Sequence, residues 1–262
     1  MKFVFNDALL EKITKNNKQL LIAFADIADI LLAHNWFVHV KKCGLAEKAV
    51  LCCFDYFSYA YALTHNIPCF LYPCSKKKIQ KNYTKHAFKV IDYLCNRYNV
   101  DIIYSETDVI ILRNFIDYLY HVLKDTNFVT CYMTNYCLSG NGVMCGKDDG
   151  IVLYYNKDVI KQIKKKAFLF SYIPSKKASS KLLKNCLPLD VNLFANNFMQ
   201  KITPLNSKTY LIHFNFTKSE KFMLSNKSLE DIISKRNNVK IALIKQHGLW
   251  LLPEKKEILS NE

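Results

Sequence analysis

Glycine and arginine are scarce in this chain of 262 residues, and each shortage excludes a class of function. The six glycines form neither a Walker-type phosphate loop nor a dinucleotide-binding pattern, and no GxSxG sequence marks a hydrolase nucleophile. The only arginines are Arg97, Arg113 and Arg236. Because bidentate reading of bases usually depends on arginine, sequence-specific binding of nucleic acid is disfavoured.

Long hydrophobic runs are also missing. No apolar segment approaches the roughly 18 residues that a membrane span requires. Asp7 interrupts the N-terminal residues too early for the apolar stretch that a secretory signal requires. Half of the residues are hydrophobic, which is typical of a globular chain long enough for one large domain. We therefore expect a cytoplasmic protein with no transmembrane segment, in a microbial or viral setting.

Cysteine is plentiful but lacks the spacing of a metal or redox motif. Ten cysteines are present, Cys52 and Cys53 are adjacent, and no CxxC pair occurs. Several lie inside apolar segments, where cysteine behaves as a small hydrophobic residue. Reduced, structural thiols are expected, and a disulfide set or a zinc site is the alternative.

Positive charge dominates the composition, with a formal net charge of +15. The lysines form short clusters, such as 76–78 and 164–166. Such a charge favours polyanionic partners, which include nucleotides, nucleic acids and acidic membranes. A general compositional bias toward lysine and asparagine explains the same excess equally well.

Hydrophobic periodicity predicts alternating strands and helices. Strands are predicted at 19–25, 48–54, 68–72, 101–105, 128–132, 151–155 and 209–215, and helices at 26–42, 83–98, 114–124, 157–167 and 189–199. Gly44 is placed to end the first of these helices. Residues from Leu229 onward are expected to form a tail. This alternation indicates an α/β fold with a mixed, mainly parallel sheet flanked by helices, in a single domain over residues 1–262 with its core at about 19–252.

Glu106 and Asp108 interrupt an apolar run that continues to Leu112. An unpaired carboxylate is costly to bury, so two acids here need a partner, and a divalent cation is a suitable one. At strand spacing, residues two apart point the same way. The alternative is a solvated pair in a strand-to-helix loop, with Asp108 bound to Arg113.

Other polar residues follow or interrupt predicted strands. Asp26 and Asp55 each end a strand, where ligands bind in parallel sheets, although Asp55 could instead cap the next helix. His213 lies on an apolar strand and is either a core residue or a metal ligand. Asp190 is either a helix N-cap or a substrate-binding residue.

Together these segments resemble the nucleotide-diphospho-sugar transferase family of GT-A glycosyltransferases. The resemblance covers about residues 20–250, and the order of its pieces is more specific than any one of them. It rests on Ile22–Asp26, Asn35-Trp36, Cys53–Asp55, Ile103–Val109, Leu112–Asn114, Asp149–Val152, Leu189-Asp190, His213–Asn215 with Lys221, and His247–Trp250.

The resemblance implies a GT-A fold and transfer of a sugar from a nucleotide-diphosphate donor, UDP-linked, to a glycan or glycoprotein acceptor, with retained configuration. It implies a Mn²⁺ or Mg²⁺ ion bound by Asp108 and His213. Glu106 would contact the ribose or the metal's coordination sphere, and Asp26 and Asp55 the nucleoside. Asp190 and Asp149 would lie on the sugar and acceptor side, and Lys221 and Asn215 beside the diphosphate.

The chain departs from the family pattern at several of these positions. Glu106 replaces the first aspartate of the metal motif, Asp26 replaces an asparagine, and Val191 stands where a glutamine is expected. These changes leave two alternatives to an active transferase. One is a weak or inactive protein of the same fold that binds nucleotides or polyanions, and the other is a nucleotide-sugar hydrolase or nucleotidyltransferase.

Overall fold

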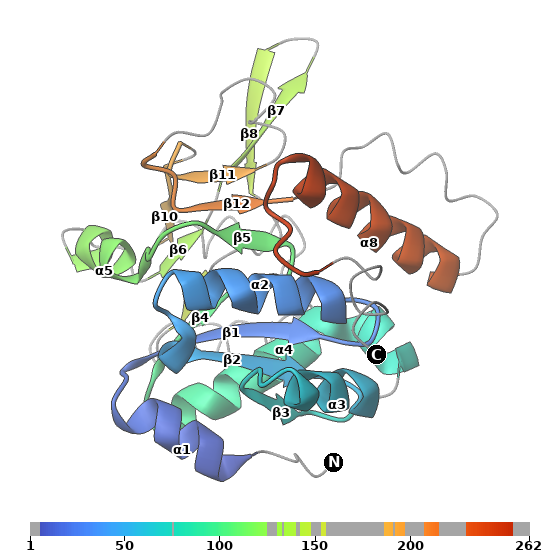
Figure 1. The fold of residues 1–262 in the computed structure, drawn as a ribbon. Helices are drawn as coiled ribbons and strands as arrows, with labels where there is room; N and C mark the ends of the chain where they lie inside the picture. The colour runs from blue at the N-terminus through green and yellow to red at the C-terminus, as the bar shows by residue number, and fades with distance from the viewer. Residues whose placement is uncertain are drawn as a thin grey trace.

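The structure is a computed structural model (Figure 1). It describes residues 6–74, 76–124, 130–132, 134–139, 142–147, 153–155, 186–190, 192–196, 207–214 and 229–253. The elements that carry the site are a central sheet, a smaller sheet beside it, and the helices between and around them.

The central sheet is formed by five strands in the order β3-β2-β1-β4-β9. These strands are β1 (Gln19–Ala25), β2 (Ala49–Cys53), β3 (Cys69–Leu71), β4 (Asp101–Tyr104) and β9 (Leu153–Tyr155). The first four are parallel and β9 is antiparallel to β4. The chain winds outward from β1 to β3 and then returns to place β4 on the other side of β1. The carboxyl ends of β1 and β4 therefore flank the switch point where ligands bind in such sheets.

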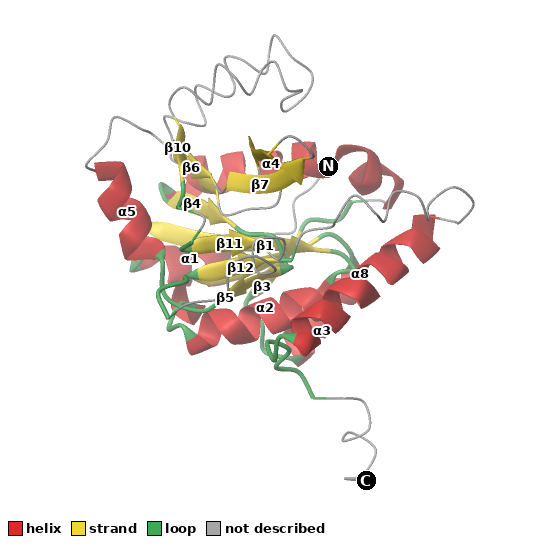
Figure 2. Ribbon diagram, turned by 90° about the horizontal axis from the view of Figure 1, so that it is seen from above, coloured by secondary structure: helices red, strands yellow, loops and turns green. Residues whose placement is uncertain are grey.

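Both faces of this sheet are buried, as its nearly continuous apolar strands require. Along β1, Leu21, Ala23 and Ala25 belong to one core cluster, whereas Leu20, Ile22 and Phe24 belong to another. Helices α2 (Ile30–Lys42), α3 (Tyr56–Thr64) and α5 (Ile116–Lys124) pack into the first cluster. Helices α1 (Asp7–Lys15) and α4 (Lys76–Tyr98) cover the second face. Figure 2 shows α4 on the opposite side of the strands from α2 and α3.

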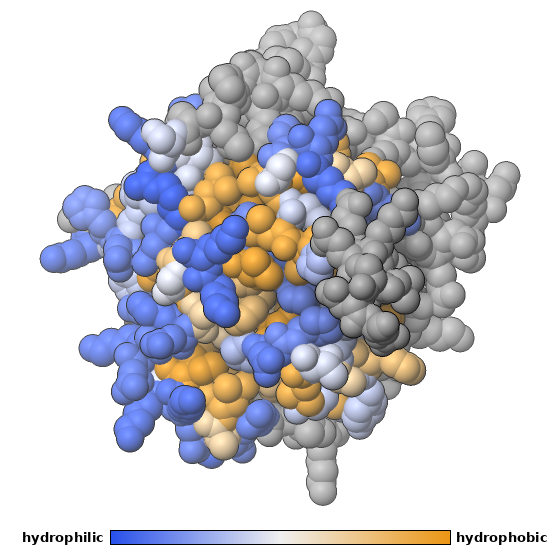
Figure 3. Space-filling model, viewed as in Figure 1, coloured by the Kyte–Doolittle hydropathy of each residue, from blue (hydrophilic) through white to orange (hydrophobic). Residues whose placement is uncertain are grey.

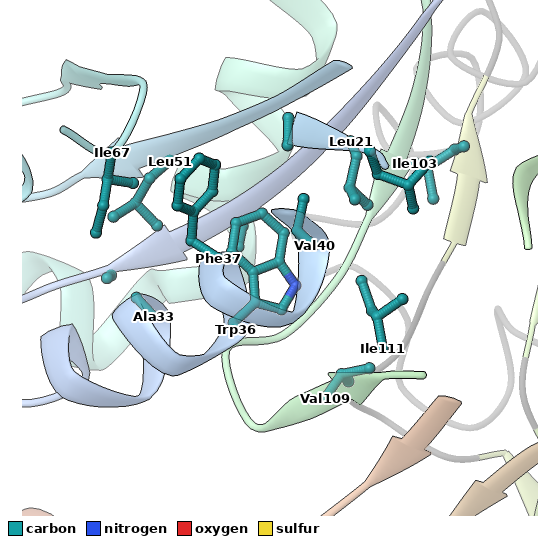
Figure 4. Close-up of a cluster of buried hydrophobic side chains, with 14 of the residues drawn as sticks. Leu21, Ala33, Trp36, Phe37, Val40, Leu51, Ile67, Ile103, Val109 and Ile111 are labelled. Carbon is teal, nitrogen blue, oxygen red and sulfur yellow. The ribbon is translucent and has the colours of Figure 1, made fainter. Parts of the chain in front are cut away.

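Trp36 is the largest side chain at the centre of the first cluster and is fully buried. It lies on α2 with Ala33, Phe37 and Val40, facing side chains from β1, β2 and β4 (Figure 4). Val109 and Ile111 of β5 (Val109–Ile111) approach the same helix from the other side. Helix α2 thus joins the central sheet to the strand that follows the two acids.

The smaller sheet has the order β11-β12-β5. Strand β12 (Leu211–His213) runs antiparallel to β5 and parallel to β11 (Phe194–Asn196). Its side chains form a third core cluster with Leu32 of α2 and Ile244 of α8 (Leu229–Gln246). Two further pairs are β6 (Thr130–Tyr132) with β10 (Cys186–Pro188) and β7 (Thr134–Ser139) with β8 (Gly142–Lys147).

Two helices end in the same backbone motif. Gly44 and Gly248 have φ values of 71° and 67°, which glycine adopts without steric cost. After α2, Leu45 N–H donates to the Val40 carbonyl, and after α8, Leu249 N–H donates to the Ile244 carbonyl. This is the Schellman arrangement. The predicted helix end at Gly44 is confirmed.

The predicted α/β class, with a mixed, mainly parallel sheet flanked by helices, is confirmed, but three local predictions are wrong. The described part of 189–199 contains strand β11 instead of a helix, because Phe194 and Ala195 pair with β12 in a buried sheet. Leu229–Gln246, in the segment expected to be a tail, forms helix α8. The core begins before the predicted start at about residue 19, because Asp7–Lys15 forms α1 and buries Leu10 and Ile13. The predicted helix at 157–167 lies outside the described residues.

The segment after α8 docks onto α2 through two buried polar side chains. Asn35 donates to the Leu249 carbonyl (3.2 Å) and accepts from the Leu251 N–H (2.8 Å). His39 Nε2 lies 2.8 Å from the same Leu249 carbonyl, and burial lowers the pKa of His39. Asn35 and Leu249, more than 200 residues apart, thus meet at one contact.

The surface mixes hydrophilic and hydrophobic side chains on the face seen in Figure 3. The most exposed large apolar side chains include Tyr56 and Phe57 at the start of α3. No helix in the described part of the chain is both long and apolar enough to cross a bilayer.

Asn35→Ala is expected to destabilise the protein by about 2 kcal/mol, because it leaves the partly buried Leu251 N–H without its side-chain partner and removes one of the two side-chain contacts of the Leu249 carbonyl. Urea unfolding measures the loss. Asn96→Ala is the matched control, since the amide of Asn96 is exposed and bonds only within its own helix. Equal effects of the two substitutions would contradict this account of the docking contact.

Candidate metal centre

The two acids lie in a turn between β4 and β5, so the strand geometry predicted for them does not persist. The turn is fixed from behind by Ser105, whose hydroxyl donates to the Glu106 carbonyl (3.0 Å). Trp36 Nε1–H of α2 donates to the same hydroxyl (3.1 Å) in the buried interior. The large core residue therefore also holds the acid-bearing turn in place.

The β5–β12 register brings His213 to this turn. His213 pairs with Val109, and the N–H of Phe214 donates to the Asp108 carbonyl (3.1 Å). His213 Nε2 lies 3.3 Å from Asp108 Oδ1 and 3.4 Å from Glu106 Oε2. The His213 and Asp108 side chains are 0% and 3% exposed, and Glu106 is 33% exposed. Two buried groups thus face one carboxylate that reaches solvent.

Helix α8 adds a fourth charged group, Lys240. Its ammonium group donates to Asp108 Oδ2, and its side chain is only 10% exposed. Asp108 is therefore divided between two partners, with Oδ2 bound to Lys240 and Oδ1 turned toward His213. The suggested pair between Asp108 and Arg113 does not form, because Arg113 donates to the Ser207 carbonyl and lies over the Tyr210 ring.

The surroundings push the pKa values of the two acids in opposite directions. Burial would raise the pKa of Asp108, but the positive charges of His213 and Lys240 outweigh it and hold that pKa below its ordinary value. Burial raises the pKa of Glu106, where the hydrogen bond to His213 opposes the rise and the charge of Asp108 adds to it. Asp108 is therefore ionised throughout the physiological range.

The donor set fits a divalent cation. One ligand atom from each of Glu106, Asp108 and His213 lies within 4.8 Å of the others. Two atoms that each bind one ion at about 2.1 Å can be up to about 4.2 Å apart, and the measured separations of 3.3 and 3.4 Å fall within that limit. Asp108 Oδ1 is buried and accepts no hydrogen bond within the described residues. Two carboxylates and one imidazole are ligands that divalent cations take in proteins.

Asp26 and Asp55 lie at adjacent strand ends, as predicted. Asp55 accepts from the N–H of Ser58 at the start of α3 and from the N–H of Ile27, both at 2.8 Å. It therefore caps α3 and also holds the loop after β1. Asp26 accepts from the N–H of Ala28 (2.8 Å) in that loop.

Helix α8 also contacts this loop. Asn237, one helical turn before Lys240, donates to the Ala28 carbonyl (2.6 Å) and to Asp29 Oδ1 (2.9 Å). The loop after β1 and the acid turn after β4 are thus joined by two side chains from one face of α8. This helix is the piece that spans the switch point of the central sheet.

The remaining predicted site residues are not placed at this centre. Asp190 is exposed, and its carboxylate accepts from the backbone and side-chain N–H groups of Asn192 in the turn before β11. Asp149, Asn215 and Lys221 lie outside the described residues. Their roles stay predictions.

Lys240 and Asn237 were missed by the sequence analysis, because residues from 229 onward were taken as a tail. The glycine rule that predicted the end of α2 at Gly44 applies equally to Gly248 and would have identified a helix ending there. Asn237, Lys240 and Ile244 then fall at i, i+3 and i+7, on one helical face. Nothing in the sequence indicates which acid Lys240 meets.

Comparison with known proteins gives structural likenesses only: no family model and no curated protein matches this sequence. Similar solved structures include the glycosyltransferase GlyE of Streptococcus pneumoniae, 14% identical over 92% of this chain and 66% of that one, with a TM-score of 0.49. A glycosyltransferase involved in glycosylation of the major capsid of PBCV-1 is 10% identical over 78% and 96% of the two chains, with a TM-score of 0.47.

A third similar structure is the galactosyltransferase LgtC in complex with donor and acceptor sugar analogs, 10% identical over 80% of this chain and 98% of that one, with a TM-score of 0.46. This chain spans just under two thirds of the length of the pneumococcal protein. At such identities and TM-scores, function has to be inferred from the site.

Asp29 provides a test of the contact between α8 and the loop after β1. Burial, reinforced by Asp26, raises the pKa of Asp29 from 3.8 to about 6, against the hydrogen bond from Asn237. Because the folded-state pKa is raised, the proton on Asp29 stabilises the fold fully below about pH 4, and this contribution is lost as the pH rises through about 6. Asp29→Asn keeps the acceptor and removes the charge. It is expected to be more stable than wild type by roughly 1–2 kcal/mol near pH 7.5 and equal near pH 4.

Urea unfolding at the two pH values measures this difference. Asp117→Asn, at an exposed position on α5, is the matched control and should show no such dependence. A stability difference between Asp29→Asn and wild type that stays constant with pH would show that Asp29 ionises in the folded protein as it does in the unfolded one.

Proposed function

We propose that this protein is a metal-dependent glycosyltransferase that moves a sugar from a nucleotide-diphosphate donor to a glycan or glycoprotein acceptor. The donor is proposed to be UDP-linked and the metal Mn²⁺ or Mg²⁺. The observation that carries the proposal is the convergence of Glu106, Asp108 and His213 on one point beside the switch point of the sheet.

The position of the cluster supports a nucleotide as ligand. The loop after β1 and the turn after β4 flank the crevice in which parallel α/β sheets bind ligands. Asp55 fixes the loop after β1 through the N–H of Ile27 (2.8 Å), and Asp26 lies at its start, half-exposed. We assign Asp26 to the nucleoside and Asp55 to positioning that loop, while the metal cluster would face the diphosphate.

The residues of the cluster have separate tasks. Asp108 stays ionised and is oriented by Lys240 through one oxygen, which leaves the other for the cation. His213 is held by its strand with Nε2 toward the same point. Glu106, the most exposed of the three, contacts either the ion or the ribose. A bound divalent cation would neutralise the charge that develops on the diphosphate as the glycosidic bond breaks.

The acceptor side of the proposed site rests on the sequence resemblance. Asp190 and Asp149 are assigned to the sugar and acceptor, and Asn215 and Lys221 to the diphosphate. Asn215 follows Phe214, whose N–H donates to the Asp108 carbonyl. This sequence position directly after the metal centre supports its assignment.

One observation favours a rival function. The ion pair between Lys240 and Asp108 satisfies one carboxylate oxygen of Asp108 without a metal. A protein that binds nucleotides without catalysis could use the same ion pair. The two functions differ in their products. A transferase passes the sugar slowly to water and faster to an acceptor, and each transfer releases the nucleoside diphosphate. The binding protein releases none.

Asp108→Asn and His213→Gln are each expected to lower Mn²⁺-dependent release of UDP from a panel of UDP-sugars at least about 100-fold, because each removes a metal ligand while conserving size. Measurement of released nucleotide with Mn²⁺, with Mg²⁺ and with EDTA checks this. Thermal shift with UDP and Mn²⁺ should show stabilisation of the wild type that both variants lose.

Asp117→Asn and His121→Gln are the matched controls, since both residues are exposed on α5. Full activity in Asp108→Asn or His213→Gln would show that the ligands are wrong. Binding of UDP without turnover of any nucleotide sugar would favour the non-catalytic function.

A further inference from the structure

Lys240 has so far been assigned only the orientation of Asp108. It is almost fully buried on α8 and donates to Asp108, a metal ligand in the proposed function. The helix that carries it is anchored independently, because Asn237 binds the loop after β1 and Ile244 lies in the core between α2 and the smaller sheet. The ammonium group lies at the end of four rotatable bonds, so it can leave Asp108 without moving the helix.

The charge of the cluster changes sign when a cation binds beside Lys240. Glu106 and Asp108 carry two negative charges and Lys240 one positive charge, so the cluster has a net charge of −1 when it is counted with His213 in the neutral form that binds a metal. A divalent cation makes it +1. Without Lys240 the corresponding values would be −2 and 0. The lysine therefore repels the cation and attracts the anionic donor.

We propose that Lys240 makes metal binding dependent on the donor. In the absence of donor, its ammonium group competes with the divalent cation for Asp108. When a nucleoside diphosphate binds, the ammonium group transfers its hydrogen bond from Asp108 to a phosphate oxygen. The cation then binds the carboxylate without competition. Metal and diphosphate are then bound as a pair. This inference rests on the proposed function and identifies Lys240 as a donor-binding residue of the same site.

Electrostatics predicts the direction in which removal of Lys240 changes the affinities for the cation and for the diphosphate. Like charges a few ångströms apart in a partly buried site repel by several kcal/mol before screening and relaxation, so removing Lys240 strengthens binding of the cation alone. The same removal takes a cation from the diphosphate and weakens its binding. A residue that only held α8 in place would alter both affinities in the same direction or neither.

The test measures two dissociation constants for wild type and for Lys240→Met. Binding of Mn²⁺ alone, followed by electron paramagnetic resonance, is expected to tighten about ten-fold or more in the variant. Binding of UDP at saturating Mn²⁺, followed by calorimetry, is expected to weaken about ten-fold. Neither measurement requires turnover, so the result is independent of the sugar and the acceptor.

Controls separate charge from structure. Lys245→Met removes an exposed lysine of the same helix and should leave both affinities unchanged. Lys240→Gln can still donate to Asp108 but carries no charge, and it should reproduce both shifts; it also replaces Lys240→Met if that variant fails to fold. Lys240→Arg, which retains the charge, should stay close to wild type in both.

The outcomes are distinguishable. Mn²⁺ bound equally by wild type and the neutral variants, or more weakly by folded neutral variants, overturns the inference and leaves the proposed function standing. UDP affinity unchanged in the neutral variants overturns the transfer of Lys240 to the phosphate. Absence of Mn²⁺ binding in every form overturns the metal centre and this inference with it.

Discussion

The antiparallel pairing of β5 with β12 is the contact on which the site depends. It joins residue 109 to residue 213 and extends to the hydrogen bond from Phe214 N–H to the Asp108 carbonyl. Without it, the acid turn and the histidine would belong to unrelated parts of the chain. Contacts of such long sequence separation form late and at a high cost in chain entropy. The buried apolar side chains on both strands, Ile110 and Ile212 among them, offset that cost.

Burying Asp108 creates a second requirement. A carboxylate with 3% of its side chain exposed needs compensating charge. His213 supplies it only when protonated, and a protonated histidine does not bind a metal. The ammonium group of Lys240 supplies that charge before any metal binds, which ties the last helix of the chain to a turn formed more than 100 residues earlier. The ion pair that stabilises this buried carboxylate is therefore the one that we propose opposes metal binding.

The sequence predicted the central sheet well because its strands are buried on both faces. Gln19–Ala25 is an uninterrupted run of small and apolar residues after Gln19, and it forms β1 with the predicted bounds. Phe194–Asn196 was misassigned because three residues are too few to show a period, and their pairing with β12 is a tertiary effect. Asp108 and His213 were brought together by the family resemblance; their spacing in the chain carries no such information.

The site residues that follow strands and those on helix α8 differ in how far the sequence could have predicted them. Asp26, Asp55 and Asp108 follow strands, so parallel-sheet topology alone places them along one edge. No such rule places Lys240 and Asn237 at the site, because a polar residue on a helix is usually solvated. Only the docked position of α8 buries these two side chains. That position depends on Gly248, which turns the chain back so that Leu249 reaches Asn35 and His39 on α2. The charge that balances Asp108 is thus held by a backbone turn and a buried amide that never touch the site, and a substitution at either should weaken the centre through the docking of α8.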